Sequence, residues 1–251
     1  MKKYLILYLI FSVSLGSCVQ DVDDVFDKSP SERIEEAMKY YDNLLLSANN
    51  GWIVEYYPEA TQKYGGFVLY FKFEANDKVT VGSELAGTET EESVYSIKAD
   101  MGPTLNFDSY NSILNYFSDP ALNVGGGTGL GYEGDYEFIL EEGVASEIIL
   151  RGKKTSNTIR MTPLADGTTW EQYVEEIQLM STNGVSTQYT LTIEEEYYPI
   201  SASGRVFTIT DDTQRTVNAP FIFAPVGLKF YEPVMIKGNL LQNFVFDPSS
   251  E

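Results

Sequence analysis

The sequence predicts an α+β fold that is mainly antiparallel β, either barrel-like or made of two packed sheets, with about three helices. The 251-residue chain contains 18 tyrosines and 14 phenylalanines, residue types that favour strands. Many segments alternate apolar and polar residues, as half-buried strands do, and a few carry apolar residues at helical spacing. Helical spacing ends at about residue 182, so we expect the C-terminal part to be all β.

The N-terminus has the organisation of a bacterial lipoprotein signal. Lys2 and Lys3 precede an apolar run, and the small residues Gly16 and Ser17 stand directly before Cys18. The run is shorter than the roughly 20 residues that span a bilayer, which argues against a transmembrane helix. Cys18 is the only cysteine and so has no intramolecular disulfide partner. We therefore expect residues 1–17 to be a cleaved signal peptide and Cys18 to be lipidated.

Residues 18–28 predict an acidic tether that is extended by charge repulsion, through Asp21, Asp23, Asp24 and Asp27. Acidic residues after a lipidated cysteine resemble the export signals of surface lipoproteins in Bacteroidota, and a plain solvated linker is the alternative. The whole chain has 17 basic and 37 acidic residues, a net charge of −20. Such a charge repels nucleic acid and anionic lipid.

Residues 29–49 predict the first helix. Ser29 can cap it, Pro30 fits its first turn and Glu32 completes a capping box. Apolar residues then recur at helical spacing, and Asn49-Asn50-Gly51 is expected to stop the helix.

From Trp52 the apolar period changes to two. One strand is predicted over residues 67–73, with Phe67, Leu69, Phe71 and Phe73 on one face and Val68, Tyr70 and Lys72 on the other. Further strands are expected at residues 79–81 and 93–98, followed by a short helix that Asp108 caps, with Tyr110, Ile113, Leu114 and Phe117 facing inward.

Residues 135–162 predict a three-stranded meander, and Thr168-Thr169-Trp170-Glu171 predicts a capping box that begins a third helix. Strands are expected again from Thr187, with several confined to edges or strand ends by Pro199, Pro220, Pro225 and Pro233. We expect one α+β domain over residues 29–184 and an all-β part over 185–251 packed on the same domain. About 65 residues are few for an independent core.

Few residues in the sequence indicate a catalytic or metal-binding site. The chain has no histidine, which excludes serine–histidine and cysteine–histidine catalysis and ordinary zinc sites. Adjacent acidic residues on a strand point to opposite faces, so the paired glutamates of the chain do not by themselves form a glycosidase site. Residues 129–134 match the dinucleotide fingerprint formally, but the loop enters a strand instead of a helix, and we interpret it as a surface loop.

Aromatic residues are the better candidates for binding. Trp52, Tyr56, Tyr57 and Tyr64 lie close together in sequence and could stack on sugars, although core packing is the favoured interpretation for Trp52. Lys153 and Lys154 interrupt an acidic chain and could contact an anionic ligand, with an exposed turn as the alternative.

Several short phrases carry a family resemblance: Ser31-Glu32-Arg33, Asn50-Gly51-Trp52, Tyr57-Pro58, Tyr64-Gly65-Gly66, Gly102-Pro103, Phe107-Asp108-Ser109-Tyr110-Asn111, Phe117-Ser118-Asp119-Pro120, Gly134-Asp135-Tyr136-Glu137-Phe138 and Leu150-Arg151-Gly152-Lys153-Lys154-Thr155. Together they resemble a Bacteroidota lipoprotein family described only as a domain of unknown function. The resemblance runs from about Cys18 to about residue 182, and more loosely to Phe246; members tend to be longer at the C-terminus. It implies outer-membrane or surface placement, near starch-utilisation-type uptake pairs and sometimes a metallopeptidase lipoprotein. It brings no catalytic residues.

These observations predict a cell-envelope lipoprotein, anchored to the outer membrane through Cys18 and surface-exposed. Its expected role is a non-catalytic accessory or ligand-binding module of a nutrient-uptake system. The expected partners are the membrane and either uptake proteins or a glycan; no nucleic acid, cofactor or metal is expected. A carboxylate-based glycoside hydrolase and a structural or assembly lipoprotein stay open as alternatives.

Overall fold

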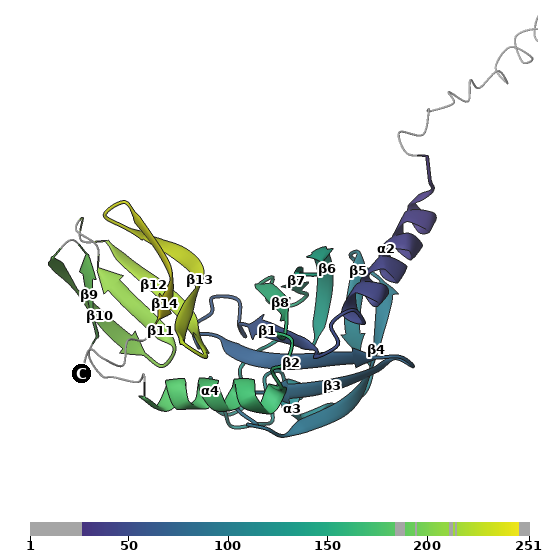
Figure 1. The fold of residues 1–251 in the computed structure, drawn as a ribbon, viewed down its shortest axis with the longest axis horizontal. Helices are drawn as coiled ribbons and strands as arrows, with labels where there is room; N and C mark the ends of the chain where they lie inside the picture. The colour runs from purple at the N-terminus through teal and green to yellow at the C-terminus, as the bar shows by residue number, and fades with distance from the viewer. Residues whose placement is uncertain (1–26, 184–188, 194, 211–212, 214, 246–251) are drawn as a thin grey trace, which may run out of the picture. The chain divides into compact units, whose positions relative to one another are not determined.

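The computed structural model describes residues 27–183, 189–193, 195–210, 213 and 215–245 (Figure 1). Cys18, the signal peptide and most of the acidic tether lie outside these residues. The chain divides into two compact units, residues 1–33 and 34–251, and all described strands belong to the second unit. The predicted fold class is confirmed: the structure is mainly antiparallel β, with three described helices.

Eight consecutive strands form a closed antiparallel barrel. Each strand pairs with the next along the chain, and pairing of the first with the eighth closes the cylinder. Closure removes the unpaired edges that an open sheet presents. The strands are β1 (Trp52–Tyr56), β2 (Phe67–Glu74), β3 (Lys78–Ser83), β4 (Thr90–Ala99), β5 (Pro103–Phe107), β6 (Glu137–Val144), β7 (Glu147–Gly152) and β8 (Thr158–Pro163).

Side chains fill the barrel interior. The four residues predicted to share one face of β2 all lie in this core: Phe67, Leu69, Phe71 and Phe73. Val68 and Tyr70, on the opposite face, lie in a second core outside the barrel. Both faces of β2 are covered, so its first five residues are all buried. This explains why β2 is a nearly continuous apolar run.

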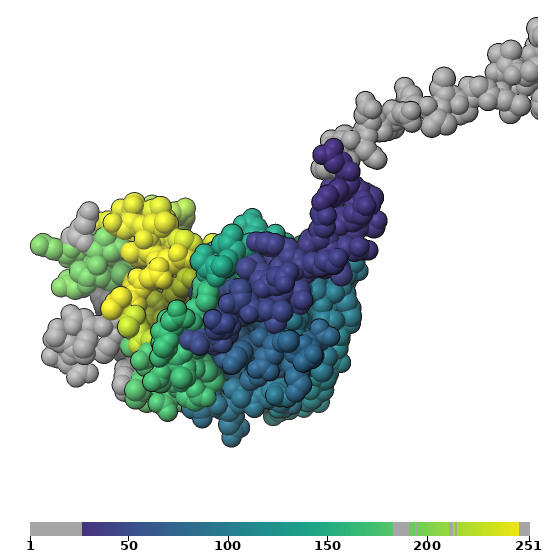
Figure 2. Space-filling view, turned by 45° about the vertical axis from the view of Figure 1, so that its right-hand side comes forward, coloured from purple at the N-terminus to yellow at the C-terminus, as the bar shows by residue number. Residues whose placement is uncertain are grey.

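Helix α2 (Pro30–Leu45) begins with the predicted capping box. The Ser29 amide donates to Glu32 Oε2 at 2.9 Å, and the Glu32 amide donates to Ser29 Oγ at 3.3 Å. The last turns of the helix lie against the barrel strands (Figure 2) and add three side chains to the barrel core, Tyr41, Leu44 and Leu45.

The segment after β4 differs from the prediction in two respects. Residues 103–107 form β5, which the sequence did not predict, and α3 (Ser112–Asn115) is capped by Asn111 instead of Asp108. The Asn111 side chain accepts from the Leu114 amide at 3.0 Å, whereas Asp108 pairs with Lys98 on β4. Leu114 and Phe117 are buried as expected, but Tyr110 is exposed.

Helix α4 (Trp170–Asn183) has its capping box one residue later than predicted. The Thr169 amide donates to Gln172 Oε1 at 3.0 Å, and the Gln172 amide donates back to Thr169 Oγ1 at 3.3 Å. The predicted apolar stripe joins the second core through Trp170, Val174 and Ile177, with Tyr173 packed against it.

Six further strands form an open antiparallel sheet, again in chain order. They are β9 (Tyr189–Ile193), β10 (Glu196–Ser203), β11 (Val206–Thr210), β12 (Thr216–Ala224), β13 (Gly227–Ile236) and β14 (Asn239–Val245). Strand β10 was not predicted. Pro199 and Pro220 lie in interior strands, not at sheet edges, but each stands where the pairing on one side of its strand ends. A missing N–H is tolerated there.

The open sheet and the barrel share the second core. Val68 and Tyr70 of β2 lie in one apolar cluster with Ile222 and Phe230 of the sheet. A polar contact also connects the barrel to the sheet: the hydroxyl of Tyr231 on β13 accepts a hydrogen bond from the amide of Thr158 on β8 at 2.9 Å. Among the described residues, no helix is both long enough and apolar enough to cross a bilayer.

Candidate ligand-binding pocket

The structure places the predicted binding residues Trp52, Tyr56 and Tyr57 in the core, with exposed fractions of 0%, 0% and 2%. Trp52 Nε1 donates to the Leu45 carbonyl at 2.8 Å, and the Tyr56 hydroxyl donates to the Asp135 carbonyl at 2.9 Å. Burial raises the pKa of Tyr56 and of Tyr57 well above the ordinary value. These side chains offer no exposed surface on which a ligand could stack.

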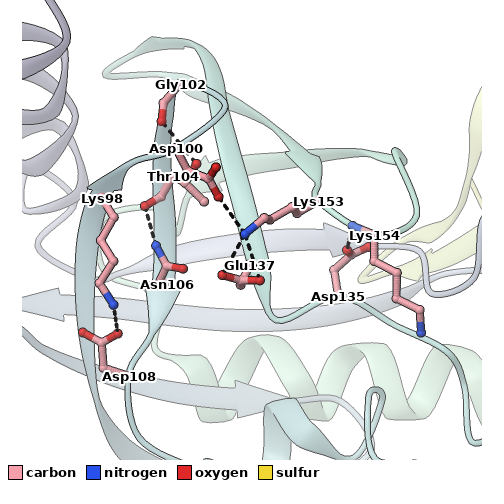
Figure 3. A network of polar contacts seen from close by, with 10 residues as sticks. All are labelled: Lys98, Asp100, Gly102, Thr104, Asn106, Asp108, Asp135, Glu137, Lys153 and Lys154. Atoms are coloured by element: carbon pink, nitrogen blue, oxygen red, sulfur yellow. Dashed lines mark hydrogen bonds and ion pairs between the residues drawn. The ribbon is translucent and has the colours of Figure 1, made fainter. Parts of the chain in front are cut away.

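Lys153, one of the two lysines predicted to contact an anionic ligand, already has carboxylate partners within the protein. Its Nζ lies 2.7 Å from Asp100 Oδ2 and 3.2 Å from Glu137 Oε1 (Figure 3). The hydrogen bond with Asp100 raises the pKa of Lys153. An anion would have to displace both carboxylates, so this lysine is a poor anion site.

Lys154 contributes its backbone, while its exposed side chain points away from the network (Figure 3). The Lys154 amide donates to Asp135 Oδ1, and the Thr155 hydroxyl donates to Asp135 Oδ2, both at 2.5 Å. The buried Asp135 carboxylate therefore holds the β7–β8 turn in place. A hollow of 260 Å³ is lined by Asp135, Lys153 and Lys154.

A larger pocket, with a volume of 460 Å³, lies elsewhere in the structure. Of the four aromatic residues predicted as candidates for binding, Tyr64 lines this pocket. We call it the Tyr64 pocket. Its volume falls within the range of about 300–1,000 Å³ typical of small-ligand sites. Its lining comes from the β1–β2 loop, the segment after β3, the glycine-rich loop and the β10–β11 turn: Lys63, Tyr64, Phe67, Leu85, Gly125, Tyr132, Ser203, Gly204 and Arg205.

The β1–β2 loop that carries Tyr64 is held in an unusual conformation. Glu59 and Gln62 have left-handed φ angles of 60° and 53°. Glu59 Oε2 accepts from the Thr61 amide at 2.9 Å and from its hydroxyl at 2.6 Å, while Asn157 Nδ2 donates to the Glu59 carbonyl at 2.7 Å. Burial acts to raise the pKa of Glu59, but the hydrogen bonds from Thr61 and Lys63, together with the charge of Lys63, lower it below the ordinary value. Backbone strain of this kind gathers at functional sites.

Aromatic rings form the wall of the pocket. The Tyr64 and Tyr132 rings meet edge to face with centroids 5.2 Å apart, and Tyr132 meets Phe67 at 5.3 Å. The Tyr64 hydroxyl is buried. It lies beside Gly126, where an added Cβ would come within 2.6 Å of the hydroxyl oxygen, so a larger residue here would have to displace the Tyr64 side chain or the loop. Burial raises the pKa of Tyr132.

Both cations of the pocket have carboxylate partners. Arg205 binds Glu84 in a fork, with contacts of 2.6 and 3.1 Å, and donates to the Gly66 carbonyl at 2.8 Å. Lys63 Nζ lies 2.9 Å from Glu133 Oε2, and that hydrogen bond raises the pKa of Lys63. The charged groups of the pocket therefore balance to zero.

The arrangement is suited to binding. The aromatic wall supplies apolar faces, while Lys63, Glu133 and Ser203 supply polar groups near the rim. Across the described parts of the chain, no group of at least three histidine, cysteine or acidic side chains is placed to hold a metal ion. Arg205 and Glu84 form a fixed floor, because the exposed fractions of their side chains are only 16% and 3%.

Sequence reasoning reached Tyr64 but missed Tyr132, Lys63 and Arg205. Tyr132 stands inside the glycine-rich loop, which the sequence identified correctly as leaving a helix and entering a strand. Arg205 lies in a turn between two strands, one of which was not predicted. Only the folded chain brings these three distant segments together, so local patterns could not reveal the pocket.

Comparison with known proteins identifies the family and nothing finer. No curated protein and no solved structure matches the chain significantly. A family model described as a domain of unknown function (DUF4302) matches residues 22–248, which include every described strand and helix. The chain belongs to this DUF4302 family.

Proposed function

We propose that this protein is a lipid-anchored lipoprotein of the Bacteroidota cell envelope that binds a ligand without chemically changing it. In this proposal it serves an outer-membrane nutrient-uptake system as an accessory module. The observation that carries the binding role is the Tyr64 pocket, where aromatic faces and rim polar groups meet in a volume of 460 Å³. The two cations of the lining are each paired with a carboxylate.

The anchor rests on the sequence around Cys18. A basic start, a short apolar run and small residues before a lone cysteine support lipidation. More than one acyl chain gives stable anchoring, because each buried methylene contributes about 0.8 kcal/mol. The aspartates after Cys18 support placement on the cell surface.

Metabolic labelling with palmitate tests the anchor. Cells that express the full chain should yield a labelled protein in the membrane fraction. Cys18→Ser should abolish the label and release the protein from membranes, whereas Ser14→Ala, inside the signal run, should change neither. Undiminished labelling of the Cys18→Ser protein would refute the anchor.

Binding without catalysis needs a separate test. The detergent-solubilised chain should retain envelope proteins or polysaccharides in pull-down experiments, and bound polysaccharide should be recovered at its original length. Release of new reducing ends would show a hydrolase and contradict the proposal. A chain that retains nothing would favour a purely structural lipoprotein.

A further inference from the structure

We infer that the Tyr64 pocket binds an uncharged sugar unit of a glycan, an inference that names the ligand class and rests on the proposed binding function. The first argument is electrostatic. Lys63 and Arg205, the cations of the lining, are each paired with a carboxylate at 2.9 and 2.6 Å. An anionic ligand would have to break one of these pairs, while the net charge of −20 repels it from a distance. A neutral ligand meets neither cost.

The second argument is the shape of the wall. Tyr64 and Tyr132 are both partly exposed, and their rings meet at an interplanar angle of 87°. A pyranose ring has a face of C–H groups and a rim of hydroxyls. Its C–H face fits against an aromatic ring, and its hydroxyls need polar partners at the edge of the same site. The partly exposed rings supply the apolar surface, and the polar partners come from neighbouring side chains, because the Tyr64 hydroxyl itself is buried.

The third argument concerns the rim. Lys63 Nζ lies 4.9 Å above the centre of the Tyr64 ring while it contacts Glu133. This partly exposed ion pair therefore stands beside the aromatic wall, with an ammonium donor and carboxylate acceptors next to each other. Ser203 adds a hydroxyl on the opposite segment of the lining. Mixed donors and acceptors suit a polyhydroxylated ligand better than a nucleobase or a purely apolar one.

The test uses the full chain in detergent against immobilised neutral glucans, mannans and xylans, with uronate-containing and sulfated glycans and nucleosides as rivals. We expect a neutral glycan to bind best. Tyr64→Ala should weaken that binding by about tenfold, the loss expected when one stacked aromatic is removed. Tyr64→Phe keeps the ring and should retain most of the affinity. Tyr110→Ala, at a tyrosine that is 66% exposed, should leave the affinity unchanged.

Glu133→Gln gives a second readout that does not depend on the stability of the aromatic wall. It frees the Lys63 ammonium, so affinity for uronate-containing glycans should rise relative to neutral ones. The inference is wrong if the unaltered chain prefers charged glycans or nucleosides, if no neutral glycan binds, or if folded Tyr64→Ala binds as well as the parent. If another small molecule binds in a Tyr64-dependent way, the sugar assignment fails while the proposed binding function stands.

Discussion

The barrel and the open sheet have the same strand connectivity but differ in closure. In both, each strand pairs antiparallel with its neighbour in sequence, but β1 pairs with β8 whereas β9 and β14 stand at opposite edges. The barrel therefore encloses its own core. The sheet instead covers part of its apolar face with outer side chains of the barrel, including Ile53, Val68 and Tyr70. This difference predicts that the sheet depends on the barrel more than the barrel depends on the sheet.

Phe71→Ala should produce the largest effect. Its ring is 1% exposed inside the barrel and meets the Phe107 ring at 5.1 Å. Truncation of a buried phenylalanine leaves a cavity and costs about 3–5 kcal/mol of unfolding free energy. Urea denaturation measures that loss, and hydrogen exchange with mass spectrometry should show faster exchange in both the barrel and the sheet.

Phe230→Ala is the matched variant in the sheet, where the side chain is also 1% exposed. It should speed exchange in β9–β14 while β1–β8 stay protected, because the barrel core is closed by its own strands. Equal loss of protection in both regions would contradict the one-way dependence.

The Glu84–Arg205 pair should come next, because it ties the barrel to the sheet in a nearly buried position. Glu84→Gln leaves the Arg205 guanidinium without its counter-charge, and broken buried pairs cost about 3 kcal/mol or more. Chemical denaturation measures the loss. The double variant Glu84→Gln/Arg205→Met should recover much of it, since no uncompensated charge remains.

Glu92→Gln is the control for that pair. It breaks the Lys78–Glu92 pair, whose side chains are 51% and 63% exposed, and should leave stability unchanged within error. A Glu84→Gln protein as stable as the Glu92→Gln protein would show that the buried tie does not hold the sheet to the barrel.

Much of the barrel was predictable because its signals are local. The alternation of Phe67, Leu69 and Phe71 predicted the strand and the face that these residues share, and the structure places that face inside the barrel. The turn at Asn76-Asp77 has a local signal as well, because asparagine and aspartate tolerate the left-handed region in which their φ angles of 72° and 59° lie.

Two strands escaped prediction for a physical reason. In β5, Thr104 and Asn106 are buried polar residues beside Leu105, so burial no longer follows hydrophobicity. In β10, only Tyr198 is buried, so the segment lacks the apolar alternation of a half-buried strand. The Tyr64 pocket could not be predicted for another reason. Tyr64, Tyr132 and Arg205 are far apart in sequence and come together only through tertiary contacts.

Alkaline pH should weaken the contact between the two regions. Burial raises the pKa of Tyr70, on the outer face of the barrel, from 10.0 to about 12. Below pH 10 the phenol is neutral in the folded and the unfolded chain, so its contribution is fully present. As pH rises from 10 toward about 12, the unfolded chain ionises first and stability falls.

Urea midpoints measured across this pH range test the expectation. Tyr70→Phe removes the ionising group and should flatten part of the decline, although it also loses the hydrogen bond to the Asn50 carbonyl. Tyr110→Phe, at an exposed side chain, should leave the decline unchanged. A decline of the same steepness in Tyr70→Phe would show that this tyrosine contributes nothing to the alkaline loss.

The smallest effect should come from the helix caps. Thr169→Ala removes the side chain that accepts from the Gln172 amide at 3.3 Å, and such losses cost about 1 kcal/mol. Because α4 places Trp170, Val174 and Ile177 in the core that the barrel and the sheet share, the loss should lower the urea midpoint and speed exchange in both α4 and the sheet. Ser29→Ala breaks the equivalent box of α2, where the surrounding side chains are exposed, and should only fray that helix end. If the two variants lower the midpoint equally, α4 does not support the open sheet, and the dependence passes through the direct contacts between the barrel strands and the sheet.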